Sequence, residues 1–194
     1  MRNEKSHAIV KMGLQILLNL DHRGAVGADP KLGDGCGILL QIPHEFFKAE
    51  CAKLGIELPG PGDYAIGQFF LPRDPETRAR ARAIIDKSIE EEGLVVLGWR
   101  DLPVDSSDLG EAVKAVEPHH AQIFLGRGPN VADADIFELR LSLPRTAASH
   151  AIYPLGHGVR APSLLLVSSP TIVFQRMVPV SPPVSPFRPP LPPS

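Results

Sequence analysis

Apolar residues recur every three or four positions over residues 4–20, which predicts an amphipathic helix. These positions are Val10, Leu14 and Leu17, with Ile9, Ile16 and Leu20 beside them. They cover a broad part of the helix circumference. A helix with so wide an apolar face is usually buried on more than one side, so we expect it to pack between other elements.

The pattern then changes repeatedly between short apolar runs and helical spacing. Strands are predicted at 37–43, 64–72, 94–103 and 119–127, and helices at 44–55, 74–93, 105–118 and 132–143. Asp74 and Pro75 are start signals for one helix, Gly93 is its stop signal, and Pro144 is expected to break the last one. This alternation is compatible with a parallel α/β fold and with sheets covered by helices in another order.

The order of the first 143 residues does not continue. Residues 145–163 have neither the helical nor the strand period, and residues 164–178 predict two strands of a hairpin around 168–170. Eight of the last sixteen residues, 179–194, are proline. A segment with this composition lacks the donors for a strand ladder, so we expect an extended, disordered tail.

Composition narrows the class of protein. The 194 residues carry a formal net charge of −2, so neither nucleic acid nor a membrane surface is expected as a partner. No apolar run reaches the ~18 residues of a membrane span, and residues 1–13 do not resemble a secretory signal. With two cysteines, Cys36 and Cys51, a disulfide framework is not indicated, and we expect a reduced, cytoplasmic setting.

The connection over residues 20–47 holds five glycines and three aspartates. Its glycines precede a predicted strand and not a helix, which argues against a phosphate loop. Asp29 and Asp34 are too few carboxylates for a calcium loop. Two interpretations remain. The loop is purely structural, or it presents Arg23, whose guanidinium would bind a carboxylate through two parallel hydrogen bonds.

The motifs themselves show a resemblance. They are "NLDHRGAVGADPKLGDGCGILLQIPHEFF", "FFLPRD", "EGLVVLGWRDLPVDSSDLG", "EPHHAQIFLG" and "FELRL". Together they closely resemble, over residues 6–141, the N-terminal region of the class II glutamine amidotransferase domain of glutamate synthase large subunits. The resemblance implies an α+β fold of the N-terminal-nucleophile hydrolase kind, a four-layer α-β-β-α sandwich that is incomplete here. Residues 4–143 would be the partial domain, and residues 144–178 a degraded or divergent continuation.

The resemblance also implies a mechanism. The family's nucleophile is a cysteine at the first residue of the mature chain, and the α-amine of that cysteine activates the thiol. Ammonia is released from glutamine and passed on for the amination of 2-oxoglutarate. Arg23 matches an arginine that lines this site, so its expected role is site support. Asp34 matches a loop aspartate whose expected role is structural.

The chain departs from the family in its chemistry. Its first residue is Met1, and neither Cys36 nor Cys51 replaces the terminal cysteine, because an internal cysteine has no α-amine of its own. We expect both to be small buried hydrophobes. The family's later substrate and oxyanion motifs do not occur in this sequence. The interpretation is therefore a truncated fragment without glutaminase activity.

The alternative is a non-catalytic α/β interaction module. Its proline-rich tail would offer a polyproline ligand through Pro183 and Pro186 or through Pro186 and Pro189.

Cofactors and partners follow from the same resemblance. No cofactor or metal is expected in this chain. FMN, an iron–sulfur cluster and NAD(P)H or ferredoxin are implied for the full enzyme, as are glutamine, the remaining synthase domains and a small subunit as partners. His119 and His120 are adjacent on a predicted strand, so they should face opposite ways and make a poor metal pair. Trp99 is expected to pack in the core.

Overall fold

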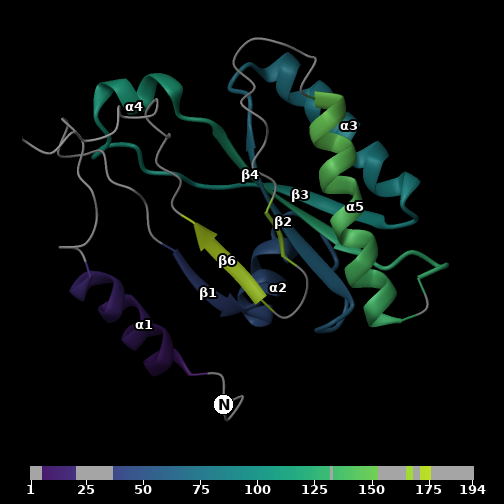
Figure 1. The fold of residues 1–194 in the computed structure, drawn as a ribbon, viewed down its shortest axis with the longest axis horizontal. Coiled ribbons are helices and arrows are strands. Elements are labelled where there is room, and N and C mark those ends of the chain that lie inside the picture. The colour runs from purple at the N-terminus through teal and green to yellow at the C-terminus, as the bar shows by residue number, and fades with distance from the viewer. Residues whose placement is uncertain (1–5, 21–36, 132, 153–164, 168–170, 176–194) are drawn as a thin grey trace, which may run out of the picture.

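The computed structural model describes residues 6–20, 37–131, 133–152, 165–167 and 171–175. In this part of the chain, four strands form one sheet in the order β3-β4-β2-β5, and two strands form a second, β1-β6 (Figure 1). The strands are β1 Gly37–Gln41, β2 Tyr64–Leu71, β3 Val95–Asp101, β4 His119–Gly126, β5 Leu165–Val167 and β6 Thr171–Gln175. Every strand pairing among these residues is antiparallel. The described strands therefore form antiparallel sheets covered by helices, and the parallel alternative does not apply to them.

Two helices cover one face of the four-stranded sheet. They are α3, Pro75–Glu91, and α5, Ala134–Ile152, which lie side by side over the strands in Figure 1. The core between them and the sheet is built from side chains of β2, β4, α3 and α5, among them Phe69, Ile85, Ile123, Phe137 and Leu141. Burying these side chains is the main stabilising contribution on this face.

The opposite face of the same sheet is covered by α2, His44–Ala52. Phe47 of α2 packs edge-on against Phe124 of β4, with ring centroids 5.6 Å apart. Ile42, which directly follows β1, joins this second core. The remaining helix, α4, is short and runs over Glu111–Val116. The prediction of a helix over 105–118 is therefore confirmed only in its second half.

The predicted boundaries of α3 are confirmed by its capping geometry. The carboxylate of Asp74 accepts a hydrogen bond from the backbone N–H of Thr77 at 2.7 Å, and Pro75 occupies the first turn. Gly93 has a φ of +73°, which a side chain would strain, and so it ends the helix in the left-handed region. Gly55 plays the same role after α2, at a φ of +70°.

The predicted environment of α1, His7–Asn19, is wrong for the part of the chain that the structure describes. Val10, Gly13 and Leu17 are partly buried, and Gly13 lies against the side chain of Ile38 in β1. The other apolar side chains are between 45% and 69% exposed, namely Ile9, Met12, Leu14, Ile16, Leu18 and Leu20. The spacing measures how much apolar surface a helix carries, but it does not say which elements cover it.

Two predictions for the C-terminal third need correction. The helix α5 does not break at Pro144 but continues to Ile152. Pro144 is buried, and burial of its apolar ring opposes the cost of the helix hydrogen bond that proline removes. The segments 165–167 and 171–175 are strands as predicted, yet they form no hairpin. Instead β5 pairs with β2, and β6 pairs with β1. The tail over 179–194 and its two proline motifs lie outside the described residues.

The close approach of two chain segments generates a first prediction. Gly128 follows β4, and a Cβ atom at this position would overlap the carbonyl oxygen of Gly93. We expect Gly128→Ala to lower the free energy of unfolding by about 2 to 3 kcal/mol, because one of the two backbones must move. The measurement is urea unfolding followed by circular dichroism. Gly60→Ala is the matched control, since its Cβ would come no closer than 3.7 Å to its neighbour. Equal stability of the two variants would contradict the close contact.

Candidate functional site

The predicted site residue Arg23 lies outside the described residues, as do Asp34 and Cys36. The elements that border this connection are described. The helix α1 ends at Asn19 and β1 begins at Gly37, and the contact between Gly13 and Ile38 holds the two elements together. The role of Arg23 therefore stays a prediction. The two elements that border its connection, α1 and β1, contact each other through Gly13 and Ile38.

A buried arginine is the centre of the polar groups beneath α2. Arg100 is 9% exposed. Its Nη2 donates to Glu50 Oε2 of α2 at 2.8 Å, and its Nη1 donates to Gln122 Oε1 of β4 at 3.2 Å. Hydrogen bonds from Lys53 and from Arg100 hold the pKa of Glu50 below its ordinary value. Arg100, which lies on β3, thus links α2 to β3 and β4.

Arg100 was not among the site residues predicted from the sequence. The available signal was the alternation of β3, which places Arg100 on the face opposite to Trp99. An arginine at a strand position that faces the interior needs a carboxylate partner, because an unpaired buried charge is costly. The partner itself is fifty residues away in the sequence, so only the packing of α2 identifies it as Glu50.

Cys51 lies on the same covered face and is chemically inert. It is completely buried, and burial raises the pKa of its thiol to about 11. Burial likewise raises the pKa of Tyr64 to about 12, and its hydroxyl lies 3.1 Å from Nδ1 of His44. Neither group ionises near neutral pH. The prediction that Cys51 is a small buried hydrophobe is confirmed, and Cys51 does not supply a nucleophile.

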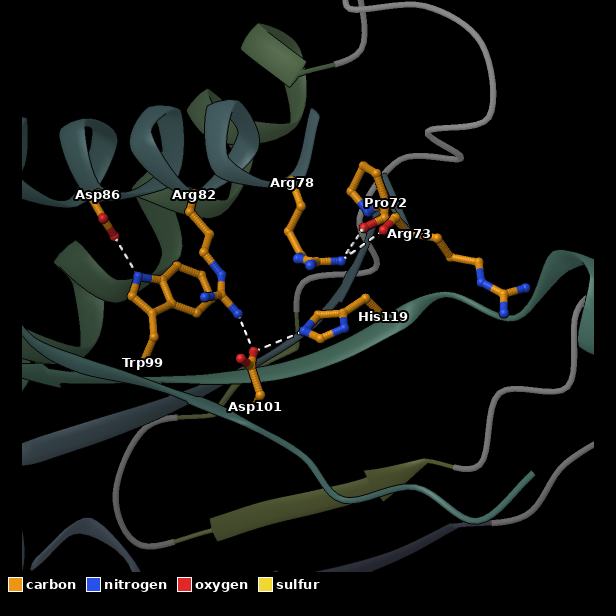
Figure 2. Close-up of polar contacts among 8 residues, drawn as sticks. All are labelled: Pro72, Arg73, Arg78, Arg82, Asp86, Trp99, Asp101 and His119. Atoms are coloured by element: carbon orange, nitrogen blue, oxygen red, sulfur yellow. Dashed lines mark hydrogen bonds and ion pairs between the residues drawn. The ribbon is translucent and has the colours of Figure 1, made fainter. Parts of the chain in front are cut away.

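A second polar cluster lies at the end of the sheet on the α3 side (Figure 2). We call Arg78, Arg82, Trp99, Asp101 and His119 the Asp101 cluster. Asp101 accepts hydrogen bonds from Arg82 and from His119 Nε2, the latter at 2.8 Å. Arg82 stacks over the Trp99 ring at 4.9 Å. Partial burial acts to raise the pKa of Asp101, but the bonds from His119 and Arg82 outweigh it and keep the pKa below its ordinary value.

Trp99 is fixed from two sides. It packs against the core beside Phe69, as predicted, with ring centroids 5.2 Å apart. Its indole N–H also donates to Asp86 of α3 at 2.9 Å. Burial raises the pKa of Asp86, against the effect of this hydrogen bond. The tryptophan therefore positions the side chains of α3 as well as filling space.

The two adjacent histidines have separate surroundings, as the strand alternation predicts. His119 belongs to the Asp101 cluster, whereas His120 packs edge-on against Phe70 at 5.1 Å. Within the described ranges, no group of three or more His, Cys, Asp or Glu side chains is arranged to hold a metal ion. The helices of these ranges also include none with the length and apolar character of a membrane span.

The buried thiol gives a second prediction. A shift of the Cys51 pKa from 9.0 to about 11 lowers the thiolate fraction about 100-fold. In a Cys36→Ser variant, we expect iodoacetamide at pH 7.5 to alkylate the folded protein at least about 100-fold more slowly than the urea-unfolded protein. Mass spectrometry of timed samples measures both rates. Similar rates in the two states would show that Cys51 is accessible and reactive.

A third prediction concerns acid stability. Burial lowers the pKa of His120 below 6.5, with Glu117 acting in the opposite direction. The unfolded chain therefore binds the proton first, so the stabilising contribution is complete above about pH 6.5 and is lost as the pH falls below it. We expect His120→Gln to reduce the loss in urea midpoint between pH 8 and pH 5.5. The exposed His7, changed to Gln, is the control. An unchanged pH dependence in His120→Gln would refute the assignment.

Comparison with known proteins gives a consistent result. The family model of class II glutamine amidotransferases matches residues 1–187. The large chain of the NADPH-dependent glutamate synthase of Bacillus subtilis (strain 168) is 37% identical over 178 residues, which is 92% of this chain and 11% of the relative. The corresponding large chain of Azospirillum brasilense is 33% identical over 171 residues, or 88% and 11%.

The NADH-dependent glutamate synthase of Schizosaccharomyces pombe is 36% identical over 157 residues, which is 78% of this chain and 7% of the relative. The chain thus spans about a tenth of the length of these curated relatives or less. The resemblance read from the motifs is confirmed, because both the family model and the relatives cover most of the sequence. This chain belongs to the class II glutamine amidotransferase family.

Proposed function

We propose that this chain is part of the glutaminase domain of a glutamate synthase. In this function, ammonia is released from the side-chain amide of glutamine and used to aminate 2-oxoglutarate. The observation that carries the proposal is the family match over residues 1–187, in a chain whose curated relatives are named glutamate synthases. The described sheets and helices agree in kind with an α+β amidotransferase domain. The full four-layer α-β-β-α arrangement is part of the proposal.

Arg23 is the residue of this chain proposed to support the glutamine site. A guanidinium binds a carboxylate through two parallel, charge-assisted hydrogen bonds, which fixes the orientation of the ligand. The small residues that follow, Gly24 to Ala28, allow a ligand to approach the backbone closely. Asp34, later in the same connection, is proposed to stabilise the loop through its own backbone amides.

The described cysteine is not the nucleophile of the proposed reaction. Class II amidotransferases attack the amide with a terminal cysteine, whose own α-amine activates the thiol. Cys51 cannot take this role, because it is completely buried and burial raises its pKa to about 11. The proposed role of residues 1–194 in the glutaminase domain is to form the sheet framework and the Arg23 loop.

The cofactors and further partners belong to the proposal as well. An iron–sulfur cluster takes four cysteine thiolates in most proteins, and this chain has two cysteines in total. The flavin, the iron–sulfur cluster and the nicotinamide or ferredoxin donor are accordingly assigned to other parts of a longer enzyme. The remaining synthase domains and a small subunit are the proposed partners, and the cytoplasm is the proposed compartment.

A chimeric enzyme tests this proposal. Residues 6–141 would replace the matching segment of the Bacillus subtilis large chain, and glutamine hydrolysis would be measured by ammonia release. We expect the chimera to hydrolyse glutamine, and Arg23→Ala to lower its rate about 100-fold, because an orienting charge-assisted contact is lost. Arg80→Ala, at an exposed arginine of α3, is the matched control.

Two further measurements make the result interpretable. The polypeptide 1–194 alone is assayed beside the chimera, and a melting curve for each variant separates misfolding from a catalytic defect. A well-folded chimera without glutaminase activity would overturn the proposed function. A well-folded Arg23→Ala chimera with unchanged activity would show that Arg23 is structural.

A further inference from the structure

Two arginines of α3 point toward the end of the four-stranded sheet. Arg78 and Arg82 are four residues apart and so share one face of the helix, one turn from each other. Arg82 reaches Asp101 at the end of β3. His119, at the start of β4, binds the same carboxylate from the other side (Figure 2). Arg80 lies on the opposite face of α3 and pairs with Glu76.

The Asp101 cluster has more donors than acceptors. Arg82 and His119 bind the same oxygen, Oδ1 of Asp101. Nε of Arg82 is buried and has no hydrogen-bond partner in the described part of the chain. Among the described residues, the hydrogen bonds of Arg78 go to neutral carbonyl oxygens, those of Pro72 at 3.3 Å and Arg73 at 2.8 Å, and both bonds use its Nη1.

Two further carboxylates interact electrostatically with these arginines, Asp74 with Arg78 and Asp86 with Arg82. Their hydrogen bonds come from elsewhere: Asp74 accepts from the backbone and side chain of Thr77, and Asp86 accepts from the indole of Trp99. Within the described ranges, no hydrogen bond joins either guanidinium to Asp74 or Asp86, so part of the donor capacity of both arginines is unused.

We propose that the Asp101 cluster is an oxyanion-binding site that takes a phosphate group or a carboxylate between Arg78, Arg82 and His119. Guanidinium groups recognise oxyanions through paired, charge-assisted hydrogen bonds. Asp101 holds Arg82 and His119 in place, and the Trp99 ring restricts the plane of the Arg82 guanidinium. This prior ordering reduces the entropy that binding would otherwise cost. The proposed site consists only of described residues, and the proposal does not depend on glutamine hydrolysis.

The experiment is an NMR titration of the polypeptide 1–194 at constant ionic strength, set with sodium chloride. Inorganic phosphate is one probe and succinate is the other, so that the two chemical sources of an oxyanion are distinguished. The signals observed are the His119 imidazole and the Trp99 indole N–H. We expect saturable shifts of both signals with at least one probe, and the probe that saturates identifies the preferred anion.

Variants assign the binding to the cluster. Arg78→Gln and Arg82→Gln should each weaken the apparent affinity about tenfold, the effect of losing a charge-assisted hydrogen bond. Arg80→Gln, the control on the other face of α3, should leave the affinity within about twofold. Asp101→Asn should strengthen binding about threefold or more, because it removes a competing negative charge and keeps an acceptor for Arg82 and His119.

The proposal is overturned if neither probe gives a saturable shift. It is also overturned if Arg80→Gln weakens binding as much as Arg78→Gln does, because that result would indicate general charge screening. Arg82→Gln removes a contact to Asp101, and its fold is checked by circular dichroism. If it does not fold, Arg78→Gln alone decides the outcome, since in the described part of the chain the hydrogen bonds of Arg78 go to the backbone carbonyls of Pro72 and Arg73 and not to Asp101.

Discussion

The antiparallel pairing of β2 with β4 is the constraint on which the rest of the described structure depends. Its register runs without interruption from Tyr64 opposite Gly126 to Leu71 opposite His119. Because side chains alternate along a strand, this register decides which residues face α3 and α5 and which face α2. A slip by one residue would exchange the two faces and place Gln122 in the apolar core under α3.

Both faces of this strand pair are buried, and they are buried differently. The face under α3 and α5 is apolar, with Phe69, Ile123 and Leu125 at its centre. The face under α2 mixes apolar rings with the Arg100, Glu50 and Gln122 contacts. Buried ionic contacts of this kind contribute little net stability, but breaking one leaves an uncompensated charge. Their effect is to make one position of α2 on the sheet much better than its alternatives.

Side chains also alternate between the two faces of the sheet along β3, and this alternation separates the two groups of polar contacts. Arg100 and Asp101 are neighbours in sequence, yet Arg100 bonds to Glu50 of α2 while Asp101 binds Arg82 of α3 and His119 of β4. The covered α2 face holds a thiol and a phenol that stay protonated, so it is a framework and not a reactive centre. The Asp101 cluster at the sheet end instead combines ordered donors with partial solvent exposure.

The sequence by itself determined the family, most helices and strands, and the capping of α3. These features depend on local signals, such as Asp74 and Gly93, or on motifs that are contiguous in the chain. It also predicted correctly that Cys51 is buried and that Trp99 packs in the core. Tertiary structure alone decided the antiparallel order, the separate partners of β5 and β6, and the passage of α5 through Pro144. It also decided the pairing of Arg100 with Glu50 and of Asp101 with Arg82 and His119. The physical reason is that hydrophobic spacing reports which face of an element is apolar, whereas strand partners and ion pairs depend on which distant segments meet across that face.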